Sequence, residues 1–355
     1  MFDFTDIQME KLVIHRVGNK HREEGLHISP DLYKLTDGNV EELLFKYFLS
    51  PFKEKVCYKF HHETDIHLNE LYTYSWSVFN QPQSFYEQSV NILKHLYEKT
   101  SHPQVKGGEF YMAYFSGCTV NGEKVDALGI FKTEKKENYL KVAQKRNEFI
   151  LDMDTGINTK KLDKGCIIFN FADVDGYRIA IVDNVNKSSD EALYWKEEFL
   201  RLTNVHDEYF HTRNCLDLCR DFAENIYGSL YRADKKDQVV FMNEAITYFD
   251  KNDKFELDSF VQDIVREPEL IEQFKDYKQM YETNKGLEAA ENFNISGQAV
   301  KTAKRAFKNL IKLDTDIEIK VKPVAAEKGD VDFIERGYDE AKGMHFYKVY
   351  FNTEE

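Results

Sequence analysis

The sequence predicts an α+β protein, with an antiparallel sheet and flanking helices, a helical middle segment and a small C-terminal α+β unit. Asn121-Gly122 separates two runs of β-type residues, which is the strongest short-range signal for a hairpin. Apolar residues recur at helical spacing after about residue 189. The chain then continues into a basic amphipathic helix and a closing hairpin. We therefore expect three regions, at residues 1–188, 189–290 and 291–355.

The first region is expected to combine helices with antiparallel strands. Residues 9–17 have the composition of a strand, and residues 39–49 and 83–99 place apolar side chains on one helical face. Besides the hairpin at Asn121-Gly122, a second hairpin is expected to turn through Asp175-Gly176. Two hairpins supply at least four antiparallel strands, so this region should contain the sheet.

The rest of the chain is predicted to be mostly helical. Helices are expected at 190–202 and 206–230, and the second aligns Cys215, Leu218 and Cys219 on one side. Buried free cysteine behaves as a small hydrophobic residue, so we expect both cysteines in the core without a metal. Further helices are expected within 236–285 and at 296–311, followed by a strand at 315–322 and a hairpin that joins 331–336 to 345–351.

Composition excludes several classes of protein. Apolar residues make up 42 % of the 355 residues and charged residues 31 %, which is inconsistent with an intrinsically disordered chain. The five cysteines are odd in number and irregularly spaced, which argues against a disulfide scaffold. Residues 1–6 lack the features of a signal peptide, and no apolar run approaches the roughly 18 residues of a membrane span. We expect a cytoplasmic protein without membrane contact.

The net charge of −14 opposes nucleic-acid binding at long range. Charges are screened beyond about 8 Å at physiological salt, so a local basic face can still contact phosphates. Residues 292–312 contain five basic residues and no acidic one, and on a helical wheel these cations adjoin an apolar arc. The alternative is an ordinary amphipathic helix with a solvated lysine face. The predicted nucleic-acid-binding residues are Lys301, Lys304, Arg305, Lys308 and Lys312.

A secondary basic patch is expected near a sheet edge. Lysines at sheet edges often serve only to prevent pairing with another chain, so this patch has a structural alternative. Its residues are Lys132, Lys135, Lys136, Lys141, Lys145 and Arg146.

The sequence contains several histidines close together but no sharp catalytic motif. His61, His62 and His67 lie near Asp65, yet their spacing does not match a helical zinc-protease motif, and Asp65 is better explained as a helix cap. His211 shares one helix face with the two cysteines, whereas zinc needs four converging ligands. No phosphate-binding loop, dinucleotide fingerprint or nucleophile elbow occurs. We expect no catalytic residue, no metal and no cofactor.

The order of several sequence blocks resembles a known family, the bacterial nucleoid-associated proteins of the NdpA type. The blocks are KLVIH at 11–15, KGGEFYMAYF at 106–115, VDALGIFK at 125–132, LYWKEEFL at 193–200 and ENFNIS at 291–296. The resemblance extends over nearly the whole chain and implies a cytoplasmic protein found on the bacterial chromosome, without established enzymatic activity. It carries over no functional residues, and this chain ends without a basic tail.

Three hypotheses follow. The first is a non-enzymatic nucleoid-associated protein that contacts double-stranded DNA weakly and without sequence specificity through the C-terminal basic helix. The second is an acidic adaptor that a DNA enzyme such as a topoisomerase recruits to the nucleoid, because an acidic surface fits a basic partner. The third and least favoured is a metal-dependent hydrolase that uses His61, His62 and His67. Self-association into a homo-oligomer stays open.

Overall fold

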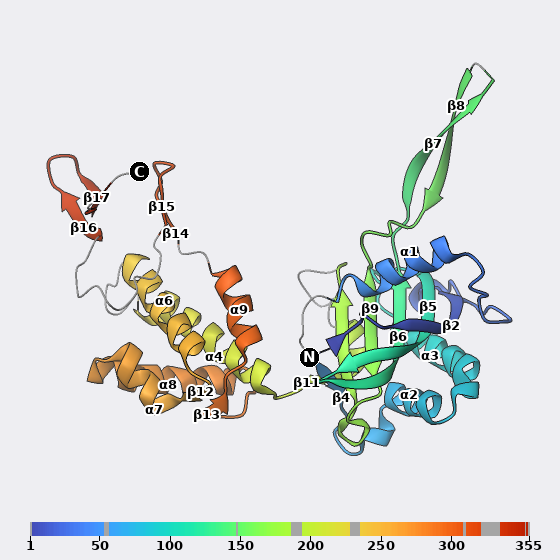
Figure 1. Cartoon of the computed structure of the whole chain (residues 1–355), viewed down its shortest axis with the longest axis horizontal. Helices are drawn as coiled ribbons and strands as arrows, with labels where there is room; N and C mark the ends of the chain where they lie inside the picture. Colours follow the sequence, from blue (N-terminus) through green and yellow to red (C-terminus); the bar gives the residue numbers. More distant parts are fainter. Residues whose placement is uncertain are drawn as a thin grey trace. The chain divides into compact units, whose positions relative to one another are not determined.

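The computed structural model describes residues 2–52, 57–146, 148–185, 194–227, 235–307, 310–320, 334–351 and 353. It divides the chain into two compact units, Met1–Val205 and His206–Glu355 (Figure 1). Each unit has its own hydrophobic core. The α+β class predicted from the sequence is confirmed.

The first unit is built on a nine-stranded antiparallel sheet. Its strand order is β11-β4-β10-β9-β6-β5-β2-β3, and β1 pairs with β5. The strands are β1 (Phe2–Asp3), β2 (Gln8–Val17), β3 (Leu26–His27), β4 (Tyr58–Phe60), β5 (Gly108–Val120), β6 (Glu123–Thr133), β9 (Lys164–Phe169), β10 (Arg178–Asp183) and β11 (Leu202–Asn204).

Helices cover both faces of this sheet. The helices are α1 (Gly38–Leu49), α2 (Glu70–Asn80) and α3 (Phe85–Lys99), of which α1 and α3 were predicted. Successive side chains of a strand point to opposite faces. Accordingly, Met112 of β5 belongs to the cluster that contains α2 and α3, and Ala113 belongs to the cluster that contains α1. Phe48 of α1 stacks on Phe131 of β6 at 4.2 Å, which fixes α1 on its face.

Both predicted hairpins are present. Asn121 and Gly122 join β5 to β6 with φ angles of 51° and 90°, a combination that suits the two-residue turn of a twisted hairpin. β9 and β10 also pair, and Gly176 is required in their connection because a Cβ there would lie 2.5 Å from the carbonyl oxygen of Phe60.

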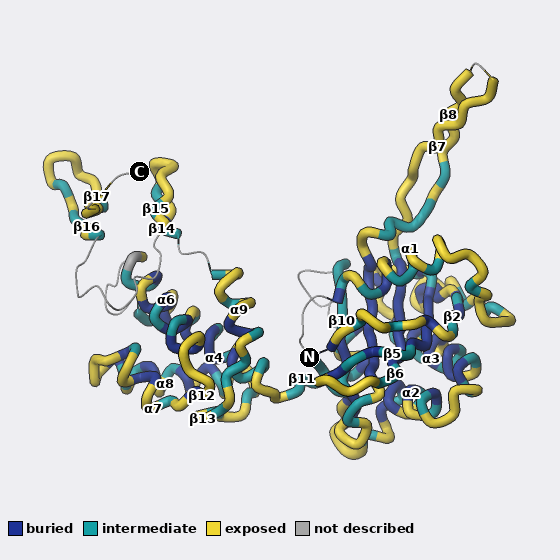
Figure 2. Tube along the Cα trace, viewed as in Figure 1, coloured by how far each residue is buried: buried dark blue, intermediate teal, exposed yellow. Residues whose placement is uncertain are grey.

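Two structural features of the first unit differ from the prediction. The helix expected at 190–202 is instead a short π-helix at Tyr194–Phe199, followed by β11, which pairs with β4; residues 190–193 of that prediction lie outside the described part. β7 (Glu137–Lys145) and β8 (Glu148–Gly156), which were not predicted, form a separate two-stranded sheet. This hairpin projects away from the nine-stranded sheet, and its trace is largely exposed (Figures 1 and 2).

The second unit packs helices around one core. Cys215 and Cys219 are buried in this core, as predicted. The elements are α4 (Glu208–Phe222), which continues as a π-helix at Ala223–Tyr227, then α6 (Lys235–Lys251), β12 (Lys254–Glu256), α7 (Leu257–Phe260), a π-helix at Val261–Val265, α8 (Pro268–Asn284), β13 (Asn292–Asn294) and α9 (Gly297–Ala306).

Two small hairpins follow the helices. β14 (Leu310–Lys312) pairs with β15 (Glu318–Lys320), and β16 (Ile334–Asp339) pairs with β17 (Met344–Val349). The strand expected at 315–322 is present at 318–320, and the closing hairpin is present at 334–339 and 344–349. Residues 321–322 and 331–333 of these predictions lie outside the described part. The helix expected at 296–311 was too long, because the backbone becomes extended at Phe307 and residues 310–312 pair as a strand.

Candidate nucleic-acid interface

The basic helix α9 is held on the second unit by its apolar side. Ser296 caps its N-terminus by accepting a hydrogen bond from the Ala299 backbone N–H, and the Ser296 N–H donates to Thr212 Oγ1 at 2.9 Å. Ala299 and Val300 are buried, and α9 packs against α4 and α6. This packing leaves the opposite face of α9 exposed to solvent (Figure 2).

Three of the predicted contact residues lie on that exposed face. Lys301, Lys304 and Arg305 are all exposed, and the last two lie in the final turn, where the helix dipole favours cations. Lys304 Nζ lies 2.6 Å from Asp250 Oδ2, an exposed pair of the kind that contributes about 0–1 kcal/mol. Among the described residues, no acidic side chain forms an ion pair with Lys301 or Arg305.

The other two predicted residues do not extend this helical face. Lys308 lies outside the described residues. Lys312 lies on β14 and pairs with Glu318 of β15 at 2.7 Å. Its predicted place on the helix was therefore wrong, because cross-strand pairing replaces the last helical turn.

The secondary basic patch is not one surface. Lys132 is fully buried, and its Nζ contacts Glu134 Oε1 at 2.8 Å, the Lys106 carbonyl oxygen at 2.6 Å and Tyr194 Oη at 3.2 Å. Burial lowers the pKa of Lys132, and the adjacent Glu134 carboxylate opposes that shift. A lysine enclosed in this way cannot contact DNA, so its assignment to a basic surface was wrong.

The remaining patch residues are exposed but divided between two elements. Lys135 and Lys136 follow β6, and Lys136 Nζ pairs with Glu109 Oε1 at 2.7 Å. Lys141, Lys145 and Arg146 lie on β7 and just after it, away from any edge of the nine-stranded sheet; Lys141 also pairs with a carboxylate of β8 at 2.6 Å. The expected sheet-edge position was therefore wrong for these three.

Sequence reasoning missed a second buried lysine beside Lys132. Lys164 is fully buried, donates to Asp183 Oδ2 at 2.5 Å and lies 4.9 Å from the centroid of the Tyr194 ring. The two ammonium groups thus share Tyr194, and each has its own carboxylate partner. Apart from Glu134, which lies two positions after Lys132, these contacts are made by groups distant in sequence, so no local pattern indicates the burial. Each buried ammonium group is therefore paired with a carboxylate and does not stand as an isolated buried charge.

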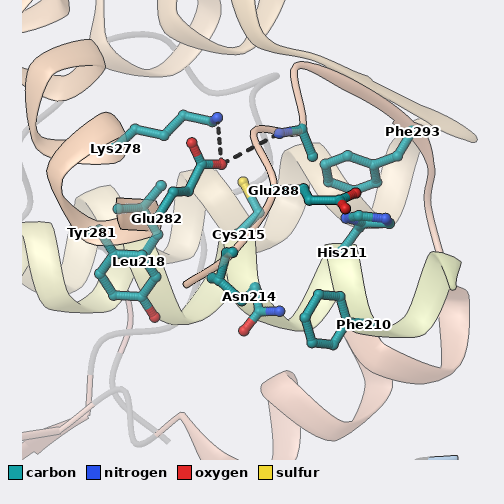
Figure 3. Close-up of a pocket in the computed structure, with 12 residues that line it drawn as sticks. Phe210, His211, Asn214, Cys215, Leu218, Lys278, Tyr281, Glu282, Glu288 and Phe293 are labelled. Carbon is teal, nitrogen blue, oxygen red and sulfur yellow. Dashed lines mark hydrogen bonds and ion pairs between the residues drawn. The ribbon is translucent and has the colours of Figure 1, made fainter. Parts of the chain in front are cut away.

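A cavity in the second unit is too small to be a substrate site (Figure 3). The cavity has room for about one water molecule. Lys278 Nζ pairs with Glu282 Oε1 at 2.6 Å, and the Ala290 N–H also points to that oxygen. Burial lowers the pKa of His211 on the opposite wall. The charges of Lys278 and Glu282 thus neutralise each other in the wall of this cavity.

The histidine cluster forms a capped turn. Asp65 accepts a hydrogen bond from the His67 backbone N–H at 2.9 Å and begins a 3-10 turn at Ile66–Leu68, which confirms the predicted cap. Within the described ranges, no three His, Cys, Asp or Glu side chains are placed to hold a metal ion. The helices in these ranges also include none that is long and apolar enough to cross a membrane.

Comparison with known proteins agrees with the family resemblance. No curated protein matches the chain. A family described as nucleoid-associated protein YejK matches residues 13–342, which includes most of both units and the whole of α9. The predicted resemblance to nucleoid-associated proteins of the NdpA type is thereby confirmed. The chain belongs to this nucleoid-associated protein family.

Proposed function

We propose that the protein acts on the nucleoid without catalysis and contacts double-stranded DNA weakly through Lys301, Lys304 and Arg305 of α9. The observation that carries this proposal is the exposure of Lys301 and Arg305 without an ion-pair partner among the described residues. The two lie one helical turn apart, so their cations project on the same side. Membership of a nucleoid-associated family supports DNA as the ligand.

The geometry favours weak and sequence-independent binding. α9 has ten residues and is about 15 Å long, so it can reach only a few phosphates. Contacts to phosphate fix position but do not read the bases. Lys304 must exchange Asp250 for a phosphate, so its net contribution is small. The overall charge of −14 also repels DNA at long range, and this repulsion grows as the salt concentration falls because screening weakens.

A salt titration with duplex DNA tests the proposal. Each contacted phosphate contributes a logarithmic slope of about −0.9, so engagement of two or three cations predicts about −2 to −3. The triple variant Lys301→Glu, Lys304→Glu and Arg305→Glu should weaken binding to all sequences alike and flatten this slope. The fold should survive, because all three side chains are exposed and the buried side of α9 is unchanged.

A matched control separates the α9 surface from overall charge. Lys34, Lys46 and Lys160 are exposed residues of the first unit for which no ion pair occurs among the described residues. Changing all three to Glu alters the net charge by the same amount as the α9 triple variant. We expect this control to bind more tightly than the α9 variant and to keep a slope closer to that of the parent, because its cations are not those proposed to contact phosphates. Equal slopes for the parent and the α9 variant would show that α9 presents only a solvated face.

The adaptor function is a second candidate because the C-terminal hairpin exposes apolar side chains. Tyr338, Met344, Phe346 and Val349 of β16 and β17 are each 45–55 % exposed. Exposed apolar surface of this kind is typical of protein interaction sites, and an acidic chain favours a basic partner such as a DNA enzyme. If the parent fails to bind DNA at low salt, while Phe346→Ser releases the protein from isolated nucleoids, the adaptor function replaces direct contact.

A further inference from the structure

The hairpin formed by β7 and β8, here called the arm, has one apolar face. The register pairs Leu140 with Met153 and Val142 with Leu151, and Phe149 lies opposite Gln144. Because side chains alternate along a strand, these five large apolar residues point to the same side of the arm. Each is 64–73 % exposed. An apolar face this open, on a strand pair that forms hydrogen bonds to no other strand in the described part of the chain, requires an explanation.

The opposite face of the arm carries its charges. Lys141, Asp152 and Asp154 lie on that side, and Lys141 Nζ is 2.6 Å from Asp154 Oδ2. Lys145 and Glu148 face each other nearer the tip on the same side. The arm is therefore amphipathic across its two faces. An isolated two-stranded hairpin is only marginally stable in water, and packing of an apolar face is what usually stabilises it.

We infer that the apolar face of the arm docks on the same face of a second copy of this chain. The face has no charged side chain, so a two-fold arrangement opposes no like charges even though each chain carries −14. A self-complementary patch is what a two-fold dimer requires, because the same residues meet from both sides. DNA and charged peptides find no complementary group on this face.

The exposed area is sufficient for such a dimer. At the observed exposures, each of the five side chains offers on the order of 100 Å² of apolar surface. Two arms together then bury on the order of 1,000 Å², which reaches the lower limit of a specific interface. The docking should therefore be reversible and dependent on protein concentration. This inference does not depend on the proposed DNA contact, because the arm belongs to the first unit and α9 to the second.

Sedimentation equilibrium of the full chain over a range of concentrations tests the inference. The parent should approach twice the chain mass of 41.8 kDa as concentration rises, at both low and high salt, because apolar burial is not screened. Changing Val142, Phe149 and Leu151 to Thr keeps strand propensity but removes much of the apolar surface. This variant should weaken dimerisation at least 100-fold. Leu151→Asp alone should also abolish the dimer, because it would bury an unpaired charge in an apolar interface.

The matched control changes the charged face of the same strands. Tyr139→Thr and Ile150→Thr alter two side chains that are each 45 % exposed on that face, and they should leave the dimer unchanged. Fluorescence of buried Trp195 verifies that the first unit stays folded in every variant. A parent that stays monomeric at all concentrations would overturn the inference. So would a dimer that the apolar-face variants leave intact, since another surface would then hold it.

Discussion

His15 should make the first unit sensitive to acid. It lies on β2 and is only 2 % exposed. Its Nδ1 accepts the Ser29 backbone N–H at 3.1 Å, so its Nε2 carries the proton and donates to Ser89 Oγ at 3.0 Å. The ring also stacks on Phe110 at 6.0 Å. Protonation of Nδ1 would remove the bond from Ser29 and leave a buried charge.

The pKa of His15 sets the size and direction of the effect. Burial, with a smaller contribution from nearby His27, lowers the pKa from 6.5 to about 4 in the folded chain. Between these pH values the unfolded chain binds more protons than the folded chain. The contribution of neutral His15 to the free energy of unfolding is therefore fully present above pH 6.5 and is lost as the pH falls toward 4. At 1.36 kcal/mol per pKa unit, the loss between about pH 7 and about pH 5 is about 2 kcal/mol.

Urea unfolding of the parent and His15→Gln at these two pH values measures this loss. Both tryptophans, Trp76 and Trp195, lie in the first unit, so their fluorescence reports its unfolding. Titrating groups that do not interact with His15 act equally in both proteins and cancel in the comparison, and the contribution of His27 is the smaller one. The stability advantage of the parent over the variant should therefore shrink by about 2 kcal/mol at the lower pH. His21→Gln, at an exposed histidine, should show no such change. If the difference in free energy of unfolding between the parent and His15→Gln is equal at both pH values, the reasoning is refuted.

Two further predictions concern the interior and a turn of the first unit. Lys132→Met should destabilise the unit by about 3–5 kcal/mol, because it leaves Glu134, whose side chain is 3 % exposed, without its cation. Adding Glu134→Gln should recover part of that loss in urea unfolding, and a double variant less stable than the single one would contradict the explanation. Gly122→Val should cost about 1–3 kcal/mol, because φ is 90° and open space surrounds the site, which leaves backbone strain as the cause. Gly38→Val, at an equally open site without positive φ, should change the melting temperature little, and equal effects of the two substitutions would contradict this assignment.

Local patterns were sufficient for much of the fold. The apolar spacing of α1, α3 and α4 and the turn residues Asn121 and Gly122 act over a few positions, so the sequence alone predicted these elements. The arm is a different case. Leu140 and Val142 alternate with polar residues, which is a strand signal, although the basic residues of the same stretch predict only a charged patch. That its strands form a separate sheet with one face open is a property of the folded unit.

The candidate interface shows where the sequence stops being informative. The sequence by itself determined that residues 292–312 combine five cations with an apolar stripe. It also determined that the chain resembles a nucleoid-associated family. Tertiary structure decided which cations reach solvent. Lys132 is enclosed by Tyr194, which is 62 positions away, and Lys312 leaves the helix because β15 pairs with its strand. The physical reason is that helical and strand periodicity depend on neighbours along the chain, whereas burial and pairing depend on groups that only folding brings together.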